Sequence, residues 1–145
     1  MIPFCKILTF GSEEHQQSIA LRRKILRVPL GLNFTEEELQ QEAEQMHIGC
    51  FTEIQLCGIL ILVKYNSTTV KMRQVAVDDT MQGKGIGRVM VVFAEQWAIT
   101  NGYTLMSLHA RETAVPFYLT LGYSIDGHQF EEVGIPHYKM IKKLI

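Results

Sequence analysis

The segment QVAVDDTMQGKGIGRVM, residues 74–90, places a glycine at every second position between two apolar stretches. Because Gly83, Gly85 and Gly87 reach positive φ without steric cost, this spacing predicts a tight turn between a strand and the start of a helix. The first turn of a helix leaves backbone N–H groups without partners and carries the positive end of the helix dipole. Residues 82–88 are therefore predicted to hold an anion such as a diphosphate, with Lys84 and Arg88 at the rim. A turn that binds nothing is the alternative.

Two common nucleotide-binding motifs do not fit this segment. A Walker A loop requires G-x-x-x-x-G-K-[ST], which these residues do not supply. The dinucleotide-binding fingerprint requires G-x-G-x-x-G after the first strand of a parallel unit, whereas the spacing here is G-x-G-x-G after several strands. The predicted anion therefore belongs to a different class of ligand.

The size and charge of the chain limit its organisation and partners. A length of 145 residues, without repeats or linker-like stretches, predicts one domain over residues 1–145. The net charge of -1 argues against a nucleic-acid partner or an anionic membrane, and no apolar run approaches the roughly 18 residues that span a bilayer. We therefore expect a soluble, cytoplasmic protein.

The three cysteines, Cys5, Cys50 and Cys57, are an odd number and lack C-x-x-C spacing. This pattern argues against a disulfide framework and against a zinc site. We expect buried free thiols and no bound metal.

Hydrophobic periodicity and turn residues predict alternating strands and helices. Ser12 is a candidate N-cap for the first helix, and Thr35 with Glu38 forms a capping-box pattern that opens a second helix ending near Met46. A later short helix carries Pro116 in its first turn and ends at Gly122. Strands are predicted at residues 6–10, 47–54, 57–65, 70–77 and 103–110, a long helix at 88–102, and a brief strand before a last strand near 137–145. This order predicts an α/β or α+β fold with a mixed, mostly antiparallel central sheet flanked by helices.

Two signatures carry a family resemblance. The first is Q-x-x-G-x-G, formed by Gln82, Gly83, Lys84, Gly85, Ile86 and Gly87 and followed by Arg88. It resembles the acetyl-CoA motif of the GNAT superfamily of N-acetyltransferases. The second, ARETAVPFYLTLGY, is similar to the Phe-Tyr helix signature of that family, and the order of elements from residue 6 to 144 matches the family plan. The resemblance implies a GNAT-like acyl-CoA N-acyltransferase fold with acetyl-CoA as cosubstrate.

The resemblance also implies which residues contact the cofactor. The diphosphate would lie on the backbone of Gln82 through Arg88, and the thioester in a slot between residues 75–77 and 108–110. At the start of the second signature many members have Asn where this chain has Arg111, which either pairs with a phosphate or lies on the surface. Further residues placed at the cofactor are Val75, Ala76, Val77 and Phe117.

The catalytic roles come from the same resemblance. Tyr118 would protonate the departing thiolate as general acid, with a purely structural tyrosine as the alternative. A primary amine must lose a proton before it attacks, and the strand before the glycines contains no carboxylate. His109 is the nearest candidate base, while Glu131, Glu132, His137 and ordered water remain alternatives.

The implied activity is transfer of an acetyl group from acetyl-CoA to a primary amine, by direct attack in a ternary complex. The acceptor would be a small molecule or a peptide amine. Arg22, Arg23 and Arg27 would favour an acidic or phosphorylated acceptor if they point inward, and otherwise form a solvated helix face. A non-catalytic acyl-CoA sensor or interaction module is the alternative function, and a homodimer is open because members often pair through sheet edges.

Overall fold

The computed structural model describes residues 2–145, which divide into two compact units. The first unit comprises the chain up to Val63 together with Gln74–Ala94. The second comprises Lys64–Arg73 together with Glu95–Ile145. The expectation of a single domain stays a prediction.

The strands confirm the predicted sheet, although the first one spans Pro3–Leu8 rather than residues 6–10. They are β1 (Pro3–Leu8), β2 (Met46–Thr52), β3 (Gln55–Lys64), β4 (Thr69–Val77), β5 (Leu105–Arg111), β6 (Ser124–Ile125), β7 (Phe130–Glu132) and β8 (Ile135–Lys143). Within residues 2–145 their order is β1-β2-β3-β4-β5-β8-β6, and β7 pairs with β8. The pair β4–β5 is parallel, whereas β1–β2, β2–β3, β5–β8, β6–β8 and β7–β8 are antiparallel. The sheet is therefore mixed and mostly antiparallel, as expected.

The four predicted helices are present, although the long one begins at Ile86 rather than residue 88, and four short helical segments were not predicted. The helical segments are α1 (Glu13–Arg22), η1 (Arg23–Arg27), η2 (Val28–Leu30), α2 (Glu36–Gln40), η3 (Asp79–Met81), α3 (Ile86–Thr100), η4 (Glu112–Ala114) and α4 (Val115–Thr120). The Ser12 side chain caps α1 by accepting from the His15 backbone N–H, and Thr35 and Glu38 form the predicted capping box of α2. However, α2 ends at Gln40 rather than near Met46, because single turns follow in which Glu42 points into the protein interior.

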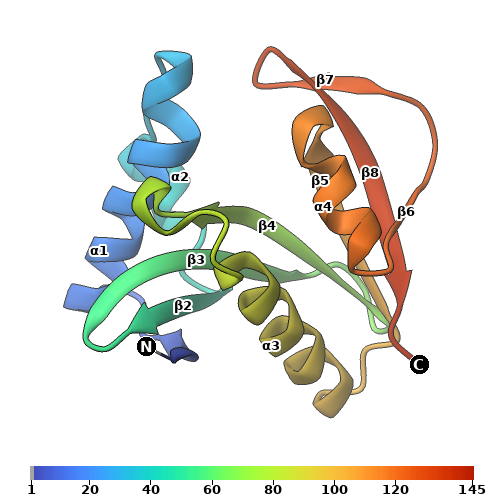
Figure 1. Cartoon of the computed structure of the whole chain (residues 1–145), viewed down its shortest axis with the longest axis horizontal. Helices are drawn as coiled ribbons and strands as arrows, with labels where there is room; N and C mark the ends of the chain where they lie inside the picture. The colour runs from blue at the N-terminus through green and yellow to red at the C-terminus, as the bar shows by residue number, and fades with distance from the viewer. Residues whose placement is uncertain (1) are drawn as a thin grey trace. The chain divides into compact units, whose positions relative to one another are not determined.

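In the first unit, α1 and the beginning of α3 pack on opposite faces of β3. Ile59 of β3 joins a buried cluster with Leu21 of α1, whereas its neighbour Gly58 faces α3. A Cβ atom at Gly58 would lie 2.7 Å from Met90 Sδ and 3.1 Å from Ile86 Cγ2. This close approach fixes the N-terminal half of α3 and, with it, the glycine turn that precedes it (Figure 1).

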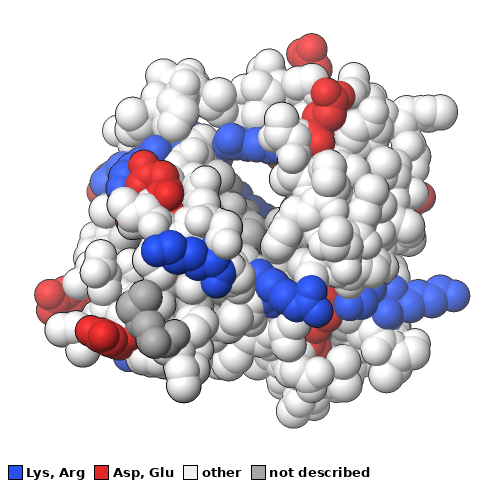
Figure 2. All heavy atoms as spheres, viewed as in Figure 1, with Lys and Arg blue, Asp and Glu red and all other residues white. Residues whose placement is uncertain are grey.

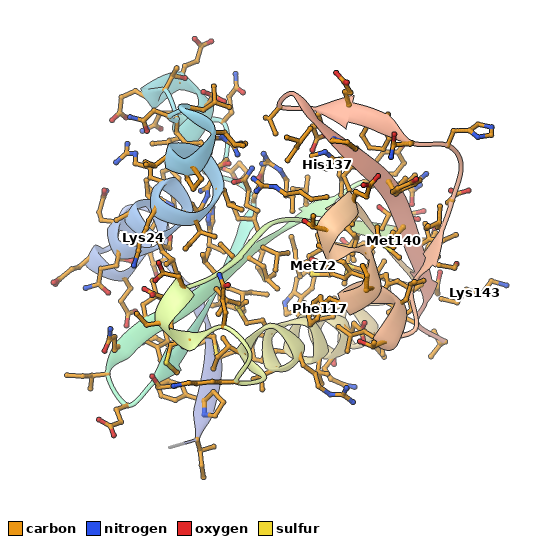
Figure 3. The ribbon with its side chains drawn as sticks, turned by 45° about the horizontal axis from the view of Figure 1, so that its top comes forward. Lys24, Met72, Phe117, His137, Met140 and Lys143 are labelled. Atoms are coloured by element: carbon orange, nitrogen blue, oxygen red, sulfur yellow. The ribbon has the colours of Figure 1, made fainter. Side chains whose placement is uncertain are left out.

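In the second unit, β5 lies between the first half of β4 and β8. The parallel pairing joins Thr69–Met72 to Leu105–Leu108. Met72, Leu108 and Met140 sit side by side on the three strands and are almost fully buried. Figure 3 labels both methionines, and Figure 1 shows α4 beside β5. The second unit thus holds α4 on a sheet with a continuous apolar core.

The hairpin of β7 and β8 differs from the prediction, which placed one brief strand here. Its turn uses Val133 and Gly134, with φ of 47° and 77°. Two consecutive positive φ values are typical of a tight hairpin turn. Valine is unfavourable in that conformation, so the sequence Val133-Gly134 does not indicate such a turn. The hairpin matters because it carries Glu132.

Candidate active site

The glycine turn of the first unit is open and exposed. Gly83 and Gly85 have φ of 77° and 83°, which side-chain-bearing residues rarely adopt, whereas Gly87 lies inside α3 without a positive φ. A Cβ atom at either position would meet nothing within 4 Å. Buried Ile86 anchors the start of α3, so the backbone at the turn is accessible while the helix behind it is held firmly.

Side-chain hydrogen bonds stabilise residues 77–82, which lead into the turn. The Gln82 side-chain amide donates to the Val77 carbonyl at 3.1 Å. Asp78 accepts from the Thr80 backbone N–H at 3.1 Å and from its hydroxyl at 2.9 Å. The backbone hydrogen bond from Thr80 is the main cause that lowers the pKa of Asp78, which therefore carries a negative charge. Lys24 lies 3.4 Å from Asp78 Oδ1 and 3.1 Å from Asp79 Oδ1.

The strand end before the turn combines burial with an unusual backbone. Ala76 is buried, whereas Val75 and Val77 are half-buried. Gln74 has a φ of 57° inside β4, a conformation that is uncommon for a residue with a side chain. Its side-chain oxygen accepts from Arg22 Nε at 3.4 Å. The first unit therefore presents residues 75–77 and 82–88 as the predicted cofactor-binding segments.

Arg22 has surroundings that the sequence did not predict. Its side chain is fully buried, and both terminal nitrogens lie 2.8 Å from the two carboxylate oxygens of Glu42. Its guanidinium also stacks over the Phe34 ring, 4.5 Å from the centroid. Arg22 is therefore not part of a solvated helix face. Glu42 neutralises the positive charge with which Arg22 would otherwise attract an acidic acceptor. No sequence signal pairs these two residues, since Glu42 follows the end of α2.

The second unit contains Tyr118 on α4. The side chain is buried, and its ring lies 5.0 Å from that of Phe117 and 5.7 Å from that of Tyr123, both in edge-to-face geometry. Burial raises the pKa of Tyr118 well above its usual range. The phenol therefore keeps its proton at neutral pH and is able to donate it.

Glu132 of β7 brings together two of the predicted histidines. Its Oε1 lies 2.9 Å from His109 Nδ1, and its Oε2 lies 3.6 Å from His137 Nε2. Burial opposes the charge of Glu132, but the hydrogen bond to His109 and the nearby His137 and Lys71 leave its pKa below the usual value. A carboxylate on Nδ1 of His109 favours the tautomer with a free lone pair on Nε2. Such an imidazole is suited to accept a proton.

The other predicted residues of this unit differ in exposure. His137 is buried and donates from Nδ1 to the Ile135 carbonyl when that nitrogen carries the proton. Figure 3 labels His137 on β8 and Phe117 on α4, whose side chain is partly exposed. Arg111, at the end of β5, is half-buried, which lowers its pKa. Glu131 is exposed beside Glu132. The sequence indicated each of these residues separately and did not indicate a contact between them. The β7–β8 hairpin, which was not predicted, places Glu132 against His109.

The surface charge, the helices and the possible metal ligands of the described residues are features of the site's surroundings. On the face shown in Figure 2, Lys and Arg side chains occur in small groups among uncharged and acidic ones. None of the helices within residues 2–145 combines the length and apolarity needed to cross a membrane. No group of three or more His, Cys, Asp or Glu in the same range is arranged to hold a metal ion.

The sequence of this chain matches a known protein family and several curated relatives. The model of the GNAT acetyltransferase domain matches residues 30–144. The Bacillus subtilis protein YyaT is 33% identical over 76 residues, which is 52% of this chain and 51% of YyaT. The chain thus spans about half the length of the curated relatives it matches.

Solved structures with the same fold cover nearly the whole chain. A crystal structure from Lactobacillus plantarum has a TM-score of 0.84 and 24% identity, covering 97% of this chain and 99% of the other. An aminoglycoside 6'-N-acetyltransferase complexed with coenzyme A has a TM-score of 0.81 and 15% identity, covering 98% and 97%. At these identities the likeness establishes the fold alone.

Proposed function

Because the chain belongs to the GNAT family of acetyltransferases, we propose that it transfers an acetyl group from acetyl-CoA to a primary amine in a ternary complex. The observation that carries the proposal is the open glycine turn before α3, with positive φ at Gly83 and Gly85. Acetyl-CoA supplies the activated thioester, and the protein contributes binding, orientation and proton transfer. Similarity to a fold neighbour complexed with coenzyme A supports the same ligand class.

The residues of the turn fit a diphosphate. The absence of a side chain at Gly83 and Gly85 lets phosphate oxygens approach the backbone, and open space lies where a Cβ would be. The N–H groups of the first turn of α3 are left without helical acceptors and carry the positive end of the helix dipole. Exposed Lys84 and Arg88 add positive charge. Residues 82–88 would hold the diphosphate, and the backbone of Val75, Ala76 and Val77 would hold the pantetheine arm.

His109 is the base of the proposed reaction. Glu132 fixes its Nδ1 as the protonated nitrogen, which leaves Nε2 to accept a proton from the amine. The carboxylate also stabilises the imidazolium that results, as in other carboxylate–imidazole pairs. We assign Glu132 as a positioning residue and His137 as a second group beside that carboxylate.

Tyr118 is the acid of the proposed reaction. Its buried phenol retains its proton across the neutral range and would pass it to the departing thiolate. The edge-to-face contacts with Phe117 and Tyr123 restrict the ring. Cys50 and Cys57 are almost fully enclosed, which supports direct transfer over an acyl-cysteine intermediate. Phe117 and Arg111 remain candidates for cofactor contact.

The test combines turnover with cofactor affinity. The full chain is mixed with acetyl-CoA and a panel of small-molecule and peptide amines, and free thiol release and calorimetric acetyl-CoA binding are measured. We expect thiol release that depends on one class of amine. In Tyr118→Phe, we expect kcat to fall while acetyl-CoA affinity stays the same, because the hydroxyl acts only on the departing group.

Three results would change the assignment. Binding without turnover on any amine would favour the non-catalytic acyl-CoA sensor. Absence of both binding and turnover would contradict the proposed function. Equal loss of binding and turnover in Tyr118→Phe would make Tyr118 a packing residue.

A further inference from the structure

The first unit holds a cluster of three free thiols, formed by Cys5 of β1, Cys50 of β2 and Cys57 of β3. Cys5 and Cys50 are directly opposite each other in the antiparallel pairing of β1 with β2. On the other side of Cys50, the partner in β3 is Gly58, which has no side chain. Among the described residues, the cross-strand side chain directly opposite Cys50 is therefore that of Cys5.

The geometry of an antiparallel pair suits a disulfide at this position. Residues directly opposite each other point to the same face of the sheet, with Cβ atoms about 4.5–5.5 Å apart. A disulfide joins Cβ atoms about 3.5–4.5 Å apart and accepts the Cα separations found in such pairs. Because β1 pairs only with β2 at the edge of the sheet, it can shift by the small distance required.

The three thiols differ in exposure and acidity. Cys5 is half-buried, whereas Cys50 and Cys57 are 0% and 1% exposed, so Cys5 is the most accessible of the three. Contact with the Cys50 thiol lowers the pKa of Cys5, while burial raises that of Cys57 to about 11. The pKa of Cys50 is raised by its contact with Cys5 and by burial. Oxidants react with accessible thiolates, so Cys5 is the thiol that reacts first.

We propose that Cys5 and Cys50 form a reversible redox modification site, in which a hydroperoxide oxidises Cys5 and Cys50 resolves the product to a disulfide. The Cys5 thiolate attacks the peroxide oxygen and becomes a sulfenic acid as hydroxide departs. The Cys50 sulfur then displaces the sulfenic oxygen, which leaves as water with the Cys50 proton. The two thiols lose two electrons and two protons, and hydrogen peroxide is reduced to two molecules of water.

The alternative pair, Cys50 with Cys57, is disfavoured. The Cys57 thiol also contacts the Cys50 thiol, but its hydrogen bond at 3.4 Å goes to the Cys50 carbonyl, and the strand pairing is irregular between Cys50 and Phe51. Both residues are enclosed, so neither is open to a peroxide. The proposed site therefore uses the accessible thiol and its buried neighbour, and it does not depend on the proposed acetyltransferase activity.

The test follows disulfide formation in the reduced full chain. After treatment with hydrogen peroxide, intact mass and non-reducing peptide maps are measured. We expect the chain to lose two hydrogen atoms, a peptide containing Cys5 to be linked to one containing Cys50, and Cys57 to stay free. A thiol reductant should reverse the change. The same treatment of the denatured chain should lose this preference, because all three thiols are then accessible.

Variants separate the possible partners. Cys57→Ser should form the same link, and Cys5→Ser should leave Cys50 and Cys57 reduced. A link between Cys50 and Cys57 in the native chain would overturn the proposal, as would a link between two chains through Cys5. Conversion of Cys5 to a sulfinic acid with Cys50 still reduced would also overturn it. The wild-type peptide map decides the question even where a variant fails to fold.

Discussion

At the scale of single residues, Glu132 lies against two histidines. Its carboxylate contacts His109 through one oxygen and faces His137 with the other. Burial alone would raise the pKa of Glu132, yet the neighbouring histidines and Lys71 keep it below its usual value. A charged carboxylate is thus held against the Nδ1 atom of a candidate base.

Replacement of Glu132 by glutamine tests this arrangement. The amide keeps an oxygen for His109 Nδ1 but removes the negative charge that stabilises the imidazolium. We expect kcat to fall roughly 10-fold or more, with the KM for acetyl-CoA unchanged. Steady-state kinetics of Glu132→Gln and of the matched control Glu131→Gln provide the measurement. Similar kinetics for the two variants would remove Glu132 from the mechanism.

The residue scale also shows where sequence reasoning reached its limit. Tyr118, His109 and the three glycines are recognisable because each belongs to a local motif or stands alone on a strand. The Arg22–Glu42 pair joins residues from separate elements, and no local pattern predicts such a contact. Glu132 was one of several alternatives until the β7–β8 hairpin placed it against His109.

At the scale of elements, the glycine turn has a natural control elsewhere in the chain. Gly127, between β6 and β7, has a φ of 99° and, like Gly85, open space where a Cβ would be. Alanine at either position is strained by about 1–2 kcal/mol, so both variants should lose similar stability. We expect only Gly85→Ala to lower acetyl-CoA affinity, by roughly 10-fold, which is about 1.4 kcal/mol. Calorimetric titration of both variants is the measurement, and equal affinities would refute the placement of the diphosphate.

Helix α1 carries a buried histidine, His15, among other rings. The His15 ring lies 4.5 Å from that of Phe10 and 4.7 Å from that of His47. Burial, followed by the charges of His47 and Arg22, lowers the pKa of His15. As pH falls, the unfolded chain therefore binds this proton before the folded chain does. The stability linked to His15 is complete above about pH 6.5, the ordinary histidine value, and is lost as pH falls further.

Denaturant unfolding on either side of that pH tests the role of His15. We expect His15→Asn, which keeps an acceptor near the position of Nδ1, to lose less stability on acidification than the wild type. The exposed His128 supplies the control, and His128→Asn should retain the wild-type pH dependence. An unchanged slope in His15→Asn would show that other groups cause the acid sensitivity.

The starts of α1 and α2 were more predictable than the end of α2. Ser12, Thr35 and Glu38 mark their helices because capping is a local hydrogen-bonding pattern. The end of α2 depends on Glu42, which turns inward to meet Arg22. A helix end set by a distant partner leaves no local signal.

At the scale of the whole molecule, three elements of the described chain contribute residues to both compact units. They are β3, which places only Lys64 in the second unit, β4 and α3. Neither unit can lose all its structure without disrupting an element of the other. We therefore expect thermal unfolding, followed by calorimetry, to be one cooperative transition as the single-domain proposal requires. Two resolved transitions would contradict it.

The order of strands and helices was largely predictable, because hydrophobic periodicity and turn residues mark each element. The parallel pairing of β4 and β5 followed from the helix between them. The expected slot between residues 75–77 and 108–110 stays a prediction. So do the acceptor, the oligomeric state and the cellular location.

The central claim is that backbone amides of the glycine turn bind the diphosphate of acetyl-CoA. Amide chemical shifts of the isotopically labelled full chain, followed by NMR during titration with coenzyme A, test it most directly. We predict that the largest changes fall on residues 82–88 and saturate with one ligand per chain. Binding that saturates with these amides unchanged, and with the largest shifts elsewhere, would contradict the account.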